Sequence, residues 1–158
     1  MKKVLVGGSF DMFHSGHIEL INKAKTFGDY LVVMITNDER IKYKKNKNLP
    51  IYSENERLCL IQNLKAVDEA IIIKDIPENN IALKGLKTIK PDVYVRTSEV
   101  NTETLKEEIK LCQEMDIEMV ILGRYPGAEF RSSSKIIEYI IKNFKLTETQ
   151  KLINKDKI

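Results

Sequence analysis

The chain has 158 residues, of which 42% are hydrophobic and 31% are charged, and its formal net charge is +3. A chain of this length is usually one domain with a single core, so neither a metal nor a disulfide is needed to hold the fold together. Because no apolar run approaches the roughly 20 residues of a membrane span, and the first residues lack the long apolar core of a signal peptide, we expect a soluble cytoplasmic protein without membrane contact.

Short apolar runs alternate with longer amphipathic segments along the chain. In chain order, the segments expected to form strands buried on both faces are 3–7, 30–36, 69–74, 92–95 and 118–123. The segments expected to form helices are 17–27, 54–65, 102–115 and 133–144, the second preceded by Ser53 and Glu56 in the spacing of a capping box. The alternation predicts an α/β fold, a Rossmann-like three-layer α/β/α sandwich around a five-stranded parallel sheet, with ligands beyond the carboxyl ends of the strands.

Residues 1–143 are expected to form one domain, followed by a polar tail over 144–158. Two irregular stretches, 37–52 and 123–134, follow strands and therefore lie at the expected ligand-binding edge. The first is rich in lysine, which serves either solubility or an anionic ligand. Cys59 and Cys112 lie far apart and form no C-x-x-C pair, so we expect both to be buried, reduced thiols.

The turn after the first strand holds both histidines of the chain, in the stretch GGSFDMFHSGH from Gly7 to His17. Two glycines allow an anion to approach the backbone closely, and the N–H groups that begin the following helix face the same point. His14 and His17 are spaced so that both rings lean toward this point and donate to phosphate oxygens. The turn is therefore predicted to bind phosphate.

The same histidine pair is also compatible with a metal site or with packed polar residues. Zinc normally takes three or more protein ligands, and the sequence contains no further histidine. The spacing differs from the dinucleotide fingerprint G-x-G-x-x-G and from the Walker loop, so those nucleotide-binding folds are disfavoured.

These residues resemble the G-x-F-D-x-x-H-x-G-H signature of the cytidylyltransferase-like nucleotidyltransferases. The similarity to bacterial glycerol-3-phosphate cytidylyltransferases continues through GDYLVVMITNDE and VDEAII, and it is looser in the second half of the chain. The resemblance implies attack of a phosphomonoester on the α-phosphate of a nucleoside triphosphate, with release of pyrophosphate and no covalent enzyme intermediate.

The resemblance also implies roles for particular residues. Catalysis would depend on His14, His17 and a lysine after the second strand, which aligns as Lys44 with Lys42, Lys45 and Lys47 as competitors. Nucleotide contacts are expected from Gly8, Ser9, Phe10, Asp11, Gly16, Arg124, Arg131, Ser132, Ser133 and Ser134. For Asp11 the alternatives are a structural role and support of a loop or a hydrated Mg²⁺. Ser132 would also cap the last helix.

Two further basic residues, Arg57 and Lys65, fall near positions that are commonly basic in this family, although Arg57 is equally compatible with a solvated helix position. The stretch VRTSEV from Val95 to Val100 departs from the G-x-D turn of the sugar- and polyol-phosphate enzymes. The VGGSFD opening and the SSS close also resemble archaeal and eukaryotic pantetheine-phosphate adenylyltransferases.

The sequence therefore favours a Mg²⁺-dependent nucleotidyltransferase, with Mg²⁺ held by the nucleotide phosphates and no protein metal site. CTP with glycerol 3-phosphate or another polyol phosphate is the first expectation, and ATP with a sugar phosphate or phosphopantetheine is the alternative. The resemblance implies a homodimer. A nucleotide-binding module without turnover and a basic RNA-binding domain are the other classes, which the intact histidine pair and the lack of exposed sheet aromatics disfavour.

Overall fold

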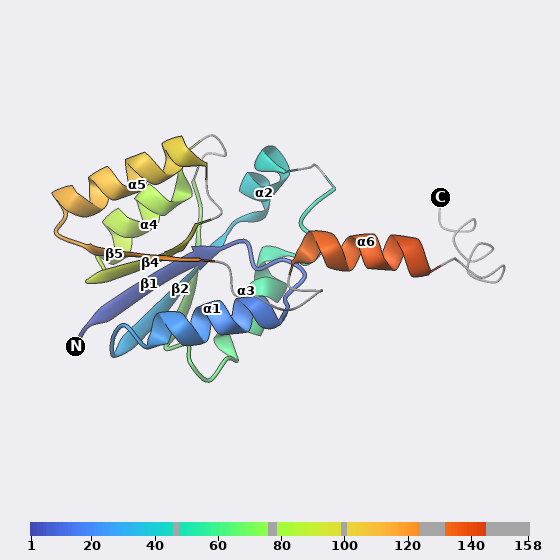
Figure 1. The fold of residues 1–158 in the computed structure, drawn as a ribbon, viewed down its shortest axis with the longest axis horizontal. Helices are drawn as coiled ribbons and strands as arrows, with labels where there is room; N and C mark the ends of the chain where they lie inside the picture. The colour runs from blue at the N-terminus through green and yellow to red at the C-terminus, as the bar shows by residue number, and fades with distance from the viewer. Residues whose placement is uncertain (46–47, 76–78, 99–100, 124–131, 145–158) are drawn as a thin grey trace.

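A computed structural model describes residues 1–45, 48–75, 79–98, 101–123 and 132–144. Its centre is a parallel sheet of five strands in the order β3-β2-β1-β4-β5 (Figure 1). The strands are β1 Lys3–Gly8, β2 Tyr30–Thr36, β3 Glu69–Ile73, β4 Val93–Thr97 and β5 Glu118–Leu122. The predicted fold class is confirmed, and the observed strand bounds lie within two residues of the expected ones.

Strand β1 lies in the middle of the sheet and pairs with β2 on one side and β4 on the other, so that Val6 is level with both Val33 and Val95. In chain order, β2 and β3 are added on one side of β1, and β4 and β5 are then added on the other side. In parallel sheets, a reversal of this kind leaves a crevice beyond the carboxyl ends of the two strands that flank it, which here are β1 and β4. The glycine-rich turn begins at the end of β1 and therefore lies at that crevice.

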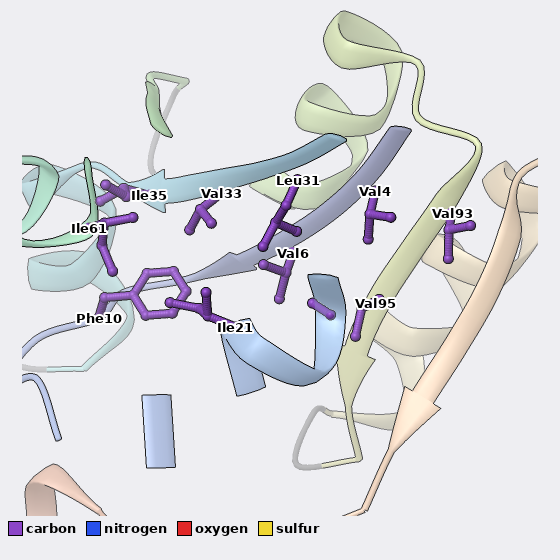
Figure 2. Close-up of a cluster of buried hydrophobic side chains, with 11 residues drawn as sticks. Val4, Val6, Phe10, Ile21, Leu31, Val33, Ile35, Ile61, Val93 and Val95 are labelled. Carbon is purple, nitrogen blue, oxygen red and sulfur yellow. The ribbon is translucent and has the colours of Figure 1, made fainter. Parts of the chain in front are cut away.

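Helices cover both faces of the sheet (Figure 1). On one face lie α1 Ser15–Lys25 and α3 Glu54–Gln62, and on the other lie α4 Ile81–Ile89 and α5 Thr102–Glu114. Each face has its own apolar core. Figure 2 shows the core under α1 and α3, where Ile21 and Ile61 pack against Val6, Val33 and neighbouring strand residues.

Two helices were not predicted. Residues Asp38–Lys44 form α2 within the stretch expected to be a lysine-rich loop, because Arg40 and Ile41 are buried although the other side chains are polar. Helix α4 contains Gly85, which weakens a helical pattern in sequence. A Cβ atom at Gly85 would lie 2.2 Å from Met34 Sδ, so the glycine allows α4 to pack closely on the sheet.

Helix α6, Ser133–Asn143, extends away from the sandwich and has no buried residue (Figure 1). The N-cap Ser132 accepts a hydrogen bond from the Lys135 amide at 3.3 Å, which confirms the predicted cap. The capping box of Ser53 and Glu56 is also confirmed. Cys112 is buried as expected, whereas Cys59 is exposed on α3, which corrects the expectation for that thiol. In the part of the chain that the structure describes, no helix is long and apolar enough to cross a membrane.

Candidate active site

The turn after β1 is held by the side chain of Phe10. Its ring is 1% exposed and packs in the core under α1, and a Cβ atom at Gly8 would lie 3.1 Å from the ring. Phe10 and Met12 both have positive φ angles, 50° and 49°, a conformation that few residues other than glycine adopt. The expectation that Phe10 lines the nucleotide site therefore needs correction for its ring, which is buried and fixes the shape of the turn.

His14 and His17 stand together at the start of α1. His14 is the N-cap residue, and the two rings are stacked with their centroids 3.8 Å apart. Phe13 stacks on His17 and Phe10 meets it edge-on, each with a centroid distance of 5.4 Å. Gly16 lies between the histidines in the first turn. The imidazoles are thus held by aromatic packing beside the unpaired N–H groups of the helix.

The hydrogen bonds of the two rings fix what each can offer a ligand. The His14 amide donates to His17 Nδ1 at 3.4 Å, so the proton of a neutral His17 ring is on Nε2. Among the described residues, His14 Nδ1 is buried without a hydrogen-bond partner. The pair therefore presents one directed donor and one buried polar atom that a ligand would satisfy.

Both imidazoles are held in the neutral form. Burial lowers the pKa of His14, and burial, followed by the neighbouring His14 and Lys45, lowers the pKa of His17 to about 3. Asp11 opposes this shift only weakly. At neutral pH the rings act as hydrogen-bond donors and not as fixed positive charges.

The lysine that reaches this site is Lys45 and not Lys44. Lys45 Nζ donates to Ser9 Oγ at 3.4 Å, and its charge acts on His17. Lys44 instead lines a groove of about 700 Å³ formed by α2, α4 and α5. Lys42 is exposed on α2, and Lys47 lies outside the described residues. The structure thus favours the competitor Lys45 over the aligned Lys44.

Arg57 is completely buried, which corrects the alternative of a solvated helix position. Its guanidinium donates to three backbone carbonyls, those of Ser9, Thr36 and Tyr52, at 2.5–3.0 Å. It also forms an ion pair with Asp38 at 2.6 Å. Arg57 therefore ties the turn after β1 to the end of β2 and to the segment before α3.

Asp11 has a comparable role on the other side of the turn. Its two carboxylate oxygens accept hydrogen bonds from the Ile51 and Tyr52 amides at 2.9 and 3.0 Å, and its carbonyl accepts one from Ser133 Oγ at 2.8 Å. Because both carboxylate oxygens are engaged by backbone amides of the segment before α3, the geometry favours a structural role for Asp11 over support of a hydrated Mg²⁺. Within the described ranges, no three His, Cys, Asp or Glu side chains form a group that could hold a metal ion.

The other expected site residues are placed unequally. Ser132, Ser133 and Ser134 stand at the start of α6, with Ser133 bonded to the Asp11 turn. Arg124 and Arg131 lie outside the described residues. Lys65 is exposed in the turn between α3 and β3. That turn is at the edge where the strands begin, so Lys65 is placed opposite the site, and its expected supporting role is corrected.

Among the buried polar residues that the sequence patterns did not predict, Glu108 is fully buried on α5 and forms an ion pair with Arg96 at the end of β4. A signal existed: Glu108 lies between Leu105 and Cys112 on the apolar face of the helix, where a charged residue is rarely found without a partner.

With this geometry established, the chain can be compared with known proteins. Residues 5–139 match the family model described as cytidylyltransferase-like. The chain belongs to this family, and its relatives indicate a nucleotidyltransferase enzyme.

Individual relatives show which nucleotidyltransferases the chain is similar to. The chain is 36% identical over 143 residues to a FAD synthase of Ferroglobus placidus, covering 89% of each chain, and 33% identical over 144 residues to a FAD synthase of Thermococcus sibiricus, covering 90% of this chain and 94% of that protein. Among solved structures, a lipopolysaccharide core biosynthesis protein of Thermoplasma volcanium has 30% identity and a TM-score of 0.66, over 80% of this chain and 99% of that one.

Replacing Arg57 with methionine should lower the free energy of unfolding by about 3–5 kcal/mol, because the change leaves buried carbonyl groups and an aspartate without their partner. Urea unfolding of the purified variant measures this. The control is Lys42→Met, an exposed position on α2, where a change within about 0.5 kcal/mol is expected. Equal losses in the two variants would contradict the role of Arg57.

The pKa of His17 predicts a pH-dependent stability. Between the ordinary histidine pKa of about 6.5 and a folded-state pKa of about 3, the unfolded chain takes up a proton that the folded chain does not. Stability should therefore fall as the pH is lowered through this window, by up to about 1.4 kcal/mol per pH unit from this residue.

The measurement is urea unfolding at several pH values between 4 and 7, for the wild type and His17→Gln. The carboxylates contribute equally to both proteins, so the variant should show the shallower slope. Parallel slopes would mean that His17 titrates normally in the folded protein.

Proposed function

We propose that this protein transfers an adenylyl group from ATP to the phosphate of FMN, forming FAD and pyrophosphate. The observation that carries the proposal is the neutral histidine pair at a helix N-terminus, in a chain that is 36% identical over nearly its whole length to a FAD synthase. The expectation of CTP and a polyol phosphate gives way to the adenylyl alternative, since the two relatives compared above by sequence are FAD synthases.

The triphosphate would lie over the start of α1. Anions bind at helix N-termini because the first N–H groups are unpaired and the helix dipole is positive there. The Nε2–H of His17 would donate to a phosphate oxygen, and His14 would contribute the second ring. The N-terminus of α6, attached to the Asp11 turn through Ser133, would face the same phosphates.

Transfer would proceed by direct in-line displacement. An oxygen of the FMN phosphate forms a bond to the α-phosphorus of ATP, the bond from that phosphorus to the bridging oxygen breaks, and pyrophosphate leaves with the electron pair. Such a reaction depends on positioning and on stabilising charge around the phosphorus. Neutral imidazoles and Lys45 meet this need without an enzyme nucleophile.

We propose that ATP binds as its magnesium complex, in which Mg²⁺ neutralises charge on the phosphates. The described residues fit a metal that is held by the nucleotide and not by Asp11, because both carboxylate oxygens of Asp11 already accept hydrogen bonds from backbone amides. The work of the chain is then to orient the triphosphate and to keep the imidazoles neutral.

A substrate matrix tests the proposal. The wild-type protein with Mg²⁺ is incubated with each of ATP, CTP, GTP and UTP against FMN, glycerol 3-phosphate, a sugar phosphate and phosphopantetheine, and pyrophosphate release is measured. The proposal requires the highest kcat/KM for ATP with FMN and the appearance of FAD. Preference for CTP with glycerol 3-phosphate would overturn it.

The two histidines should each be needed for turnover. His14→Ala and His17→Ala are expected to lower kcat by about 10²- to 10³-fold, as found when one preorganised donor to a transition state is removed. Circular dichroism checks that both variants fold. If turnover per folded molecule stayed near normal in either variant, that histidine would have no part in the reaction.

The position of a lysine should matter more than its charge. Lys45→Ala should lower kcat/KM for the nucleotide by about tenfold or more, because a charge-assisted contact beside Ser9 is lost. The matched control is Lys44→Ala, the adjacent residue, which should leave nucleotide kcat/KM within about threefold. A larger effect from Lys44 than from Lys45 would contradict the placement of the lysine.

A further inference from the structure

Glu108 is a buried carboxylate in the core between the sheet and α5. Its Oε2 atom lies 3.0 Å from Arg96 Nε and accepts a hydrogen bond from the Tyr94 hydroxyl at 3.2 Å. Its other oxygen, Oε1, is buried without a hydrogen-bond partner among the described residues. Burial raises the pKa of Glu108, and the charge of Arg96 opposes this shift. A carboxylate buried in an apolar core lowers the stability of the fold, so we expect Glu108 to have a function other than packing.

The partner of Glu108 reaches the ligand-binding edge of the sheet. Arg96 follows Val95, which pairs with Val6, so Arg96 is level with Gly7 where β1 enters the phosphate-binding turn. It is partly exposed, with its side chain at 22%. Within the described chain no other ion pair involves Arg96. The ion pair with Glu108 thus holds the guanidinium on the side of its Nε atom, which is buried and forms no hydrogen bond with the described residues. The two terminal nitrogens remain available to a ligand.

Arg96 points to the face of the sheet opposite the histidines. Side chains alternate along a strand, and in β4 Val95 packs in the core under α1 and α3 whereas Tyr94 packs in the core under α4 and α5. Arg96 therefore lies on the side of α4 and α5, which its ion pair with Glu108 confirms. The histidines stand at the start of α1, on the other side.

We infer that Arg96 binds the phosphate of the acceptor, and that Glu108 is a positioning residue that holds the guanidinium for this contact. The inference rests on the proposed function. In-line displacement places the attacking oxygen and the leaving pyrophosphate on opposite sides of the α-phosphorus. With the pyrophosphate over α1 and α6, the acceptor phosphate approaches from the side of α4 and α5, where Arg96 stands.

The chemistry of the pair suits this role. Arginine binds phosphate through two parallel N–H···O contacts, and the ion pair with the Glu108 carboxylate keeps the guanidinium at the end of β4. The stretch VRTSEV, which departs from the turn of the polyol-phosphate enzymes, thereby supplies the cation for a phosphorylated acceptor. The hydroxyl of Tyr94 donates a hydrogen bond to the Glu108 carboxylate and helps to hold it in position.

The test compares FMN with riboflavin, which differs only in lacking the phosphate. Binding of each flavin is measured by quenching of its fluorescence, and binding of ATP by calorimetry, for the wild type, Arg96→Met and Glu108→Gln. Lys110→Met and Glu114→Gln are matched controls, because they remove exposed charges from the same helix α5.

Arg96→Met and Glu108→Gln should weaken FMN binding about 10- to 100-fold, the loss expected for a charge-assisted contact. Riboflavin and ATP binding should stay within about twofold, and so should all binding by the two control variants. Equal losses for FMN and riboflavin, or a loss for ATP instead of FMN, would overturn the inference. A wild type that binds FMN no more tightly than riboflavin would also overturn it.

Two further measurements separate the possible failures. If the wild type binds FMN selectively but forms no FAD, the proposed function fails while the binding data still judge Arg96. If Glu108→Gln does not fold, the double variant Arg96→Met with Glu108→Leu replaces the pair by apolar side chains, a change that proteins often tolerate. The folded double variant should have lost the preference for FMN over riboflavin, and retention of that preference would contradict the inference.

Discussion

The candidate site depends on one buried cation, the guanidinium of Arg57. Three backbone carbonyls and one carboxylate, from the turn after β1, the end of β2, the start of α2 and the segment before α3, converge on it. Two of these contacts lie at the end of a strand and the start of a helix, at Thr36 and Asp38, and the other two lie outside regular secondary structure, at Ser9 and Tyr52. Because a buried arginine must satisfy its donors, the four segments are held in one arrangement. The position of Ser9, and through it of Lys45, follows from that arrangement.

The same fixed turn gives the site two sides. Phe10 packs into the core and fixes the turn that follows β1. His14 and His17 therefore stand at the start of α1, on one face of the sheet. Arg96 ends β4 on the other face, oriented by Glu108. A phosphorus atom placed over the end of β1 would have the histidines on one side and the arginine on the other. This geometry suits a reaction in which one phosphate approaches as another leaves.

The sequence predicted the sheet because its strands are continuous apolar runs, which a parallel sheet buried on both faces requires. The phosphate-binding turn was also predictable, since glycine, histidine and helix start occur together in one short stretch. Helix α2 was not, because only Arg40 and Ile41 of its seven residues are buried and the rest read as a polar loop. Helix α4 was missed because Gly85 weakens its helical pattern. The glycine is needed for close packing against Met34, a residue that is distant in sequence.

The roles of single charged residues were the hardest to predict. Lys44 and Lys45 are adjacent, and only the path of α2 decides which one reaches Ser9. From the sequence, Arg57 was equally compatible with a solvated position on its helix, although it is completely buried. Lys65 follows a helix whose end was expected three residues later than it occurs, and it falls at the opposite edge of the sheet. In each case the outcome depends on tertiary placement, which no local pattern contains.

In the proposed reaction, two phosphates meet directly across the end of β1, without a covalent enzyme intermediate. The stereochemistry at the transferred phosphorus tests this most directly. One diastereomer of ATP that carries sulfur on the α-phosphate is used with FMN, and the configuration of the resulting FAD analogue is determined by phosphorus NMR. We expect inversion of configuration, as a single in-line displacement requires. Retention would indicate two displacements through an enzyme-bound intermediate and would contradict the proposed reaction.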